Sequence, residues 1–393
     1  MRFILTDFHS VPPPYEITQE HAIRWLTQIH FEAERSSLKK DPSFDSALRR
    51  KIEETVERYA WKPQTPARRR SAFRDFIHDD RKEMEIFSPR FGPHGAGAKE
   101  RSLLYAREAA SAFEALYRER EDPPEDLVHV TCTGYVSPSA AQAYVNRRGW
   151  GAKTTVTHAY HMGCYAAFPA LRIALSFLNL PPSVTGRDAP RRRVDIVHTE
   201  LCTLHLDAAS HDPEQIVIQS LFADGLIRYS AVSDLSESSN PRGGIEILAL
   251  REEIFPDSLG DMTWIPSDWG MEMTLSKEVP FKVGSGIEGF LKGLFHSAEL
   301  RFEAEKAGAL FAIHPGGPRI LDASQEFLNL QDEQMRFSRE ILFDHGNMSS
   351  ATVPHIWEAI VKDPDVKPGT LIVGLAFGPG LTFCGGLFRK VKE

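Results

Sequence analysis

Three polar residues, each in a predicted turn flanked by glycine, could together catalyse acyl transfer. Cys164 directly precedes a run that predicts a helix over residues 165–180, His314 begins the segment His-Pro-Gly-Gly-Pro, and Asn347 follows a glycine. The positive end of a helix dipole lowers the pKa of a nearby thiol and favours the thiolate. A cysteine, a histidine and an asparagine can act as nucleophile, base and oxyanion donor. The sequence therefore predicts Cys164, His314 and Asn347 as a catalytic set.

Composition places these residues in a large globular protein. A chain of 393 residues with 42% hydrophobic and 25% charged residues predicts two or three domains, or one large duplicated domain. The net charge of -8 argues against general nucleic-acid binding. No run approaches the roughly 18 apolar residues that a membrane helix requires, so we expect no membrane insertion. The N-terminal apolar run is too short for a signal peptide.

The cysteines predict neither a metal site nor a disulfide framework. Their spacing shows no Cys-x-x-Cys pair and no pattern of metal ligands, which leads us to expect reduced thiols, no metal and a cytoplasmic location. The four residues are Cys132, Cys164, Cys202 and Cys384.

Alternating apolar strands and helical runs predict an α/β fold. Strands are expected at 127–132, 154–159, 194–200, 308–313 and 371–377. Helices are expected over most of 16–60, and near 98–120, 165–180, 213–222, 286–305 and 350–362. Surface loops are expected within 61–100 and 181–193, and a Ser-, Pro- and Gly-rich stretch at 236–244 predicts a boundary between residues 1–240 and 241–393.

Five motifs, in order and at matching spacing, resemble the chalcone synthase superfamily, the type III polyketide synthases. They are Gly163-Cys164-Tyr165-Ala166, Leu221-Phe222-Ala223-Asp224-Gly225, His314-Pro315-Gly316-Gly317-Pro318, Gly346-Asn347-Met348-Ser349-Ser350-Ala351 and Phe377-Gly378-Pro379-Gly380-Leu381-Thr382. The resemblance implies a thiolase fold, with two similar α/β halves in a five-layered αβαβα arrangement. It also implies that residues 1–240 carry the nucleophile and a homodimer interface, and that residues 241–393 carry the histidine and the asparagine.

The same resemblance implies roles for the residues of the site. Cys164 would attack an acyl thioester and carry the chain, while His314 and Asn347 would donate to the thioester oxygen. Phe222 matches an aromatic gatekeeper between entry tunnel and reaction chamber, and Phe377 belongs to a loop that shapes the chamber wall. No cofactor is implied, because the substrates are carried as phosphopantetheine thioesters on coenzyme A or on an acyl carrier protein.

Departures from the family pattern in one helix concern the substrate carrier. Plant members bind the phosphates of coenzyme A with three basic residues, and the matching positions here are Lys51, Glu54 and Arg58. A carboxylate at the middle position would repel a phosphate. An acyl carrier protein is the expected substitute, and such acidic proteins could dock on arginine runs at 68–70, which include Arg69, or at 147–148 and 191–193.

Departures in the pocket argue against the plant flavonoid reaction and fit a bacterial relative that handles a long aliphatic chain. Met273 replaces a second gatekeeping phenylalanine and could open the chamber, because methionine is flexible. The other changed pocket positions are Cys132, Cys202, His205, Ser137 and Trp264.

The first hypothesis is therefore an acyltransferase that joins two chains. It resembles the bacterial ketosynthases of the myxopyronin and corallopyronin antibiotic pathways, which condense two carrier-bound β-ketoacyl chains into an α-pyrone. His314 is the default base for the α-proton, and His205 is a candidate helper. The alternative is an iterative synthase that extends acyl-coenzyme A with malonyl-coenzyme A to an alkylpyrone or alkylresorcinol. A non-catalytic acyl-binding thiolase-fold protein and a cysteine protease are further alternatives.

Overall fold

The N-terminal strands form one part of a nine-stranded sheet in the computed structural model, which describes residues 2–37, 42–185, 192–233 and 243–392. In this part, β4 (Asp126–Thr131) pairs in parallel with β5 (Thr155–Tyr160) and β6 (Arg193–Leu201). β7 (Asp224–Ser233) pairs antiparallel with β6 and with β1 (Phe3–Ser10). The strands β4 and β7 are buried along their whole length, which explains why β4 appears in the sequence as an unbroken apolar run.

The later strands form the other part of the sheet. β11 (Leu310–Ile313) is parallel to β12 (Leu371–Gly378), and β13 (Thr382–Val391) lies antiparallel between β12 and β8 (Gly244–Ile254). The two parts meet where β1 pairs with β8 over a short register at Leu5 and its neighbour. Each half of the chain therefore contributes its own strands, and this short pairing makes the two sets continuous.

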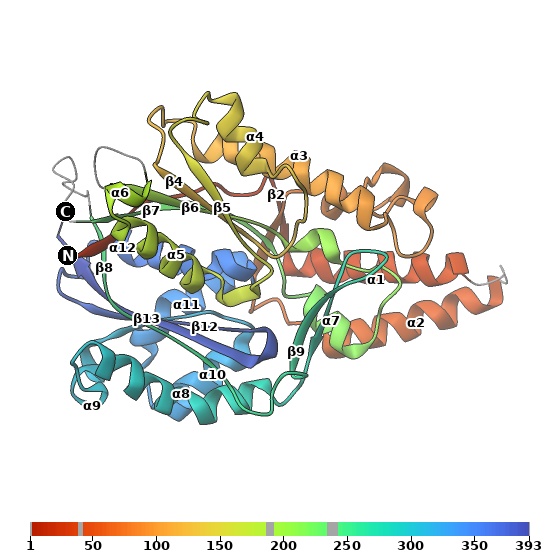
Figure 1. The fold of residues 1–393 in the computed structure, drawn as a ribbon. Coiled ribbons are helices and arrows are strands. Elements are labelled where there is room, and N and C mark those ends of the chain that lie inside the picture. The colour runs from red at the N-terminus through yellow and green to blue at the C-terminus, as the bar shows by residue number, and fades with distance from the viewer. Residues whose placement is uncertain (1, 38–41, 186–191, 234–242, 393) are drawn as a thin grey trace.

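Helices cover both parts of the sheet and also separate them (Figure 1). α5 (Ala167–Asn179) and α12 (Thr352–Lys362) lie between the two sets of strands, and each contacts strands from both halves. α3 (Ala98–Leu116) packs on the outer face of β6 and β7, and α8 (Val279–Ser297) packs on β8 and β13. The order of layers is helix, sheet, helix, sheet, helix, as expected for the thiolase fold.

Aromatic packing fills the space between the central helices and the sheet. The ring of Trp357 on α12 lies edge-on to Phe168 on α5, with ring centroids 5.6 Å apart, and 5.1 Å from the ring of Phe388 on β13. All three side chains are buried. Burying such large apolar groups is a main source of stability, and here it ties the central helices to the C-terminal strands.

A separate group of elements surrounds the end of the sheet where the predicted catalytic residues lie. It includes α1 (Gln19–Ser37), α2 (Pro42–Tyr59), α7 (Pro213–Gln219) and the hairpin of β9 (Met262–Pro266) with β10 (Met271–Leu275). The right-hand side of Figure 1 shows these elements beside one another. The remaining elements are β2 (Tyr15–Thr18), β3 (Arg68–Ser71), α4 (Ala140–Arg147), α6 (Pro182–Thr185), α9 (Phe302–Glu305), α10 (Pro318–Leu328) and α11 (Asp332–His345).

All five predicted strands are confirmed, and most predicted helices are confirmed with shifted ends. The helices expected near 286–305 are α8, which begins earlier, at Val279, and ends at Ser297, and α9 at Phe302–Glu305. The run expected as helix from residue 16 begins with strand β2 instead. The predicted boundary at 236–244 falls mostly on residues 234–242, which lie outside the described residues. Among the described helices, none is both long and apolar enough to cross a membrane.

Candidate active site

Cys164 is held in a short 3-10 turn, Gly163–Tyr165, between β5 and α5. Gly163 has φ of 71°, and a Cβ there would lie 2.6 Å from Cδ of Pro379. Only glycine fits such a position without strain. Its neighbour Cys164 is 7% exposed and is thereby fixed at the inner end of a cavity.

His314 directly follows β11 and continues the strand pairing. Its backbone N–H donates to the carbonyl of Leu375 at 2.7 Å, which fixes the residue at the end of the sheet. The side chain is buried, and neither ring nitrogen has a hydrogen-bond partner among the described residues. A buried polar group without a partner costs free energy, so an unpaired imidazole in a cavity indicates a place for a ligand.

Asn347 is positioned by a backbone bridge to the segment that carries Phe222. The N–H of Asn347 donates to Leu221 O at 3.0 Å, and the N–H of Ala223 donates to Asn347 O at 2.8 Å. The side-chain Oδ1 accepts a hydrogen bond from the N–H of Ser349 at 2.8 Å. This contact fixes the amide orientation, because only an oxygen can accept there, and it leaves Nδ2 as a donor without a described partner.

One outer cavity of about 570 Å³ brings the three predicted catalytic residues together. Cys164, His314 and Asn347 all line it, although they come from three distant parts of the chain. The predicted pocket residues Phe222, Met273 and Phe377 line the same cavity. The predicted set therefore shares one cavity, with the nucleophile and both candidate donors on its wall.

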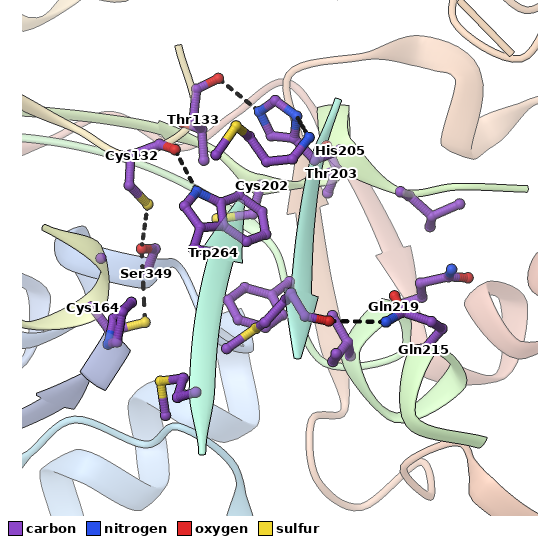
Figure 2. A pocket seen from close by; sticks show the side chains of 18 of the residues that line it. Cys132, Thr133, Cys164, Cys202, Thr203, His205, Gln215, Gln219, Trp264 and Ser349 are labelled. Atoms are coloured by element: carbon purple, nitrogen blue, oxygen red, sulfur yellow. Dashed lines mark hydrogen bonds between the residues drawn. The ribbon is translucent and has the colours of Figure 1, made fainter. Parts of the chain in front are cut away.

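A second, inner cavity continues past Cys164 (Figure 2). It has a volume of about 60 Å³ and is lined by Cys132, Cys202 and His205, as the sequence predicted for these positions. Trp264 closes part of it, with Nε1 donating to Cys132 O at 2.7 Å. A water molecule occupies about 30 Å³ of liquid, so this space holds about two waters. The expectation that the pocket changes fit a long aliphatic chain stays a prediction, and Met273, which was expected to open the chamber, lines both cavities.

His205 is a wall residue and not a free base. Its Nε2 donates to the carbonyl of Thr133 at 2.8 Å, and its Nδ1 accepts from the N–H of Met271 at 3.1 Å. Because a carbonyl can only accept and an N–H can only donate, these contacts fix the neutral tautomer. Burial lowers the pKa of His205 to about 4. The hypothesis that His205 helps His314 to remove a proton was therefore wrong.

Sequence reasoning assigned no role to Ser349, which touches the nucleophile. Its Oγ lies 3.8 Å from Sγ of Cys164 and 3.2 Å from Sγ of Cys132 (Figure 2). The thiol of Cys132 in turn lies 3.6 Å from the carboxylate of Glu200. Ser349 belongs to the Gly-Asn-Met-Ser-Ser-Ala motif, so its place in that motif was the available signal.

Glu200 is a fully buried carboxylate, and nothing in the sequence distinguished it. It accepts hydrogen bonds from the N–H of Cys132 at 3.0 Å, from Oγ1 of Thr133 at 2.9 Å and from the hydroxyl of Ser350. Burial nevertheless raises its pKa. These contacts join β4, β6 and the segment after Asn347, and so hold the inner wall of the site.

Burial governs the protonation of the nucleophile and of the histidine. It raises the pKa of the Cys164 thiol to about 12 and lowers the pKa of His314 to about 3. The expectation that a helix dipole would lower the thiol pKa was wrong. Cys164 lies one turn before α5, and burial removes water from its sulfur, which raises the thiol pKa by more than the dipole of α5 lowers it. Both groups are neutral at neutral pH in this state.

Arg69 was predicted to dock a carrier, and the structure shows that it is internal. It is 3% exposed, and its Nη1 donates to Gln219 O at 2.9 Å and to Phe222 O at 2.7 Å, while its Nε donates to Oε1 of Gln19 at 3.1 Å. A side chain so buried cannot contact another protein. Arg69 instead anchors the backbone of Phe222 beside the cavity.

The other predicted docking residues lie on the surface of α2. Lys51 and Glu54 line a shallow hollow that contains none of the catalytic residues. Arg58 is exposed, and its guanidinium lies 5.4 Å from the ring of Tyr59, which lines the outer cavity. Ser137 is exposed and does not line either cavity described above.

The arginine runs differ in what they offer a partner. Arg147 pairs with Glu114 at 2.8 Å, and Arg68 pairs with Asp344 at 3.2 Å. Arg191 lies outside the described residues. Exposed cations that already have carboxylate partners offer less charge to an acidic protein.

Comparison with known proteins agrees with this geometry. Residues 246–392 match the family of chalcone and stilbene synthases, C-terminal domain. Type III polyketide synthase C of Arabidopsis thaliana is 29% identical over 300 residues, which cover 75% of this chain and 72% of the plant protein. Probable polyketide synthase 1 of Dictyostelium discoideum is 29% identical over 267 residues, 67% of this chain but only 8% of that protein.

Solved structures share the fold over the whole chain. The C-terminal type III polyketide synthase domain of Steely1 from Dictyostelium superposes with a TM-score of 0.80 at 22% identity, covering 100% of both chains. PKS-I of the brown alga Ectocarpus siliculosus superposes with a TM-score of 0.82 at 21% identity, covering 99% of this chain and 98% of that one. Residues 246–392 thus match the family of chalcone and stilbene synthases, C-terminal domain, and the chain is similar over about three quarters of its length to a type III polyketide synthase, whose fold it shares with the solved structures.

Proposed function

We propose that the protein is a ketosynthase that loads an acyl chain onto Cys164 and condenses it with a second β-ketoacyl thioester to give an α-pyrone. The observation that carries the proposal is the shared outer cavity of Cys164, His314 and Asn347, in which the imidazole and the amide Nδ2 have no described partner. Unpaired donors that share a cavity with a thiol suit a reaction in which negative charge develops on a carbonyl oxygen.

Loading begins with a proton transfer from the nucleophile. The thiol of Cys164 gives its proton to His314 as Sγ attacks the thioester carbonyl of a phosphopantetheine arm. Asn347 Nδ2 and the imidazolium donate to the oxygen of the tetrahedral intermediate. The carbon–sulfur bond of the arm then breaks, and its sulfur leaves as a thiol with the proton that His314 returns.

Condensation uses the same donors on the second chain. His314 removes the acidic α-proton of the β-ketoacyl thioester, and Asn347 stabilises the enolate oxygen. The α-carbon attacks the acyl carbon on Cys164, so that a carbon–carbon bond forms while the bond to Sγ breaks. An enol oxygen of the product then closes on its thioester carbonyl, which forms the ring and releases the second arm as a thiol.

Two features support joining of two chains over repeated extension within the inner cavity. The inner cavity of about 60 Å³ leaves no room for a growing chain beside Trp264, whereas the outer cavity of about 570 Å³ is open to both substrates. Glu54 lies with Lys51 in the shallow hollow on α2, where a carboxylate disfavours binding of the coenzyme A phosphates. These features favour a carrier protein as the donor.

The proposal extends to a cytoplasmic homodimer. The four cysteines are free thiols, which suits a reducing compartment. β5 lies at the edge of the sheet with partly exposed residues, and the nearby Tyr135 is 44% exposed. An uncovered edge strand with an aromatic side chain beside it is suited to pairing with a second copy.

The decisive experiment offers the protein two different β-ketoacyl chains on acyl carrier protein, without malonyl-coenzyme A. We expect a pyrone whose mass contains both chains, formed without release of carbon dioxide, and absent with Cys164→Ala. Product formation that requires malonyl-coenzyme A and releases carbon dioxide would identify an iterative synthase of alkylpyrones or alkylresorcinols instead.

A further inference from the structure

The outer cavity has a buried end and an open end, which defines the path of a substrate. Cys164, His314 and Asn347 on its wall are all buried. Lys277 and Arg319 line the same cavity and are exposed. A thioester that reaches Cys164 can therefore place the distal part of its arm beside these two cations.

The two cations are not engaged by other side chains. Neither Lys277 nor Arg319 forms a hydrogen bond or an ion pair with any described residue. Nearby Lys282, by contrast, pairs with Asp261. Among the described residues, Glu214 is the one carboxylate that lines the cavity, and it accepts a hydrogen bond from the N–H of Leu275. The cavity is therefore lined by two cations and one carboxylate that already accepts a hydrogen bond. This net positive charge favours the binding of an anion.

Backbone geometry adds to this charge. Arg319 is the second residue of α10, an eleven-residue helix whose first position is Pro318 and whose N-cap is Gly317. The N-terminus of a helix carries partial positive charge and stabilises a nearby phosphate. His314 lies just before this turn, so the cationic end of α10 and the catalytic imidazole share one segment of chain.

An unpaired donor lies on the same wall of the cavity. Trp61 lines the cavity, and its Nε1 is buried with no hydrogen-bond partner among the described residues. The backbone of Trp61 is fixed, because its N–H donates to Oγ of Ser220 and its carbonyl accepts from Nε2 of Gln19. A buried indole N–H without a partner indicates a missing acceptor, such as an amide carbonyl of the arm.

We infer that Lys277 and Arg319 bind the phosphate of a phosphopantetheine thioester, with Trp61 donating to an amide carbonyl of the arm. The inference rests on the proposed function, in which such a thioester acylates Cys164. The phosphate on pantetheine is common to both donors, as part of a diphosphate in coenzyme A and as a phosphodiester on a carrier protein, so this site serves either donor. It also places phosphate binding away from the hollow on α2 that contains Lys51 and Glu54.

The test measures the rate of Cys164 acylation by intact-protein mass spectrometry with four donors of one acetoacetyl group. The donors are pantetheine, phosphopantetheine, coenzyme A and an acyl carrier protein. We expect wild-type protein to prefer phosphopantetheine over pantetheine by at least about tenfold, because hydrogen bonds to charged groups contribute strongly. The double variant Lys277→Gln/Arg319→Gln should lose this preference and should slow loading from coenzyme A and carrier protein alike.

A matched control removes one lysine and one arginine elsewhere. Lys99 and Arg118 are exposed at the two ends of α3 and do not line the outer cavity, so Lys99→Gln/Arg118→Gln should keep the preference. An unchanged preference in Lys277→Gln/Arg319→Gln would overturn the inference. A loss confined to coenzyme A would also overturn it, because the cations would then bind the nucleotide phosphates. Failure of the proposed function looks different: no donor, pantetheine included, would acylate Cys164.

Discussion

At the scale of single residues, the proposed nucleophile Cys164 and the proposed base His314 are both neutral before substrate arrives. Burial favours the thiol of Cys164 and the neutral imidazole of His314, because neither charged form is solvated in the cavity. The hydroxyl of Ser349, 3.8 Å from Sγ, and the backbone N–H of Cys164 are the groups that favour the thiolate. The reactive ion pair is therefore expected to form only when a thioester brings its carbonyl to the unpaired donors of the cavity.

This state predicts the pH dependence of Cys164 alkylation by iodoacetamide in the absence of substrate. A thiol pKa raised to about 12 means that the thiolate fraction is small at pH 7 and grows about tenfold per pH unit. We expect the alkylation rate to rise without a plateau from pH 6 to pH 9, with the signal of Cys164→Ala subtracted. A plateau below pH 8 would show a thiolate–imidazolium pair already present in the free protein.

At the scale of elements, the turn before Asn347 depends on a glycine. Gly346 has φ of 73°, and a Cβ there would lie 2.8 Å from Leu221 O and 3.0 Å from Cγ of Arg69. The turn therefore combines a left-handed backbone with close approach of two other segments. Because the same segments carry Phe222, the geometry of the gate and that of the amide donor are coupled.

Gly346→Ala should therefore destabilise the protein and slow acylation of Cys164. The backbone strain costs about 1–3 kcal/mol, and the contact with Leu221 adds to it. The control is Gly369→Ala, since Gly369 has φ of 92° and open space around its Cβ position. Denaturant unfolding should show the larger loss for Gly346→Ala, with slow acylation only there. Equal stability and equal acylation rates in the two variants would refute the coupling.

The β9–β10 hairpin sets the depth of the inner cavity. Trp264 points into that cavity from β9, while its neighbour Ile265 is 57% exposed. We expect Trp264→Ala to accept longer acyl chains, because the space gained can bury further methylene groups. An acyl chain that buries two more methylene groups should load about ten times faster, relative to the shorter chain, in Trp264→Ala than in the wild-type protein. A ladder of acyl lengths compared by mass spectrometry checks this, with Ile265→Ala as the control. The same length preference in both variants would show that the indole does not limit the chain.

At the scale of the whole molecule, the sequence allowed the layered α/β fold to be predicted, and it selected three residues that line one cavity. β4 could be located because a strand covered on both faces needs a continuous apolar run. β8 and the β9–β10 hairpin could not, because their half-exposed residues lack that run. Arg69 was misassigned because an arginine run suggests an exposed face, whereas the two-residue alternation of β3 turns Arg69 inward between exposed Arg68 and half-buried Arg70.

The protonation state of His205 and the volume of the inner cavity could not be predicted from the sequence, since both depend on tertiary contacts. The neutral tautomer of His205 follows from Thr133 and Met271, which are distant in sequence. The closing of the inner cavity by Trp264 follows from a hydrogen bond to a carbonyl 132 residues earlier. The clustering of the triad was predictable only through the order of the family motifs, because no local pattern brings the three residues together.

The proposed homodimer is a property of the whole molecule. Light scattering should give twice the 44.2 kDa mass of one chain. Tyr135→Glu, beside the edge strand β5, should shift the protein towards monomer, because it buries a charge at the interface. Phe281→Glu is the control, since Phe281 is 63% exposed on α8 in the C-terminal half. A monomeric wild-type protein, or dissociation by Phe281→Glu alone, would contradict the proposed interface.

Intact-protein mass spectrometry of one β-ketoacyl group, offered on an acyl carrier protein and on coenzyme A, tests the central claim most directly. The account predicts a single acyl adduct that maps to Cys164, forms faster from the carrier protein and is absent in Cys164→Ala. Equal or faster loading from coenzyme A would contradict the carrier-based chain-joining reaction. An adduct on another cysteine, or no adduct from either donor, would contradict the assignment of Cys164 as the nucleophile.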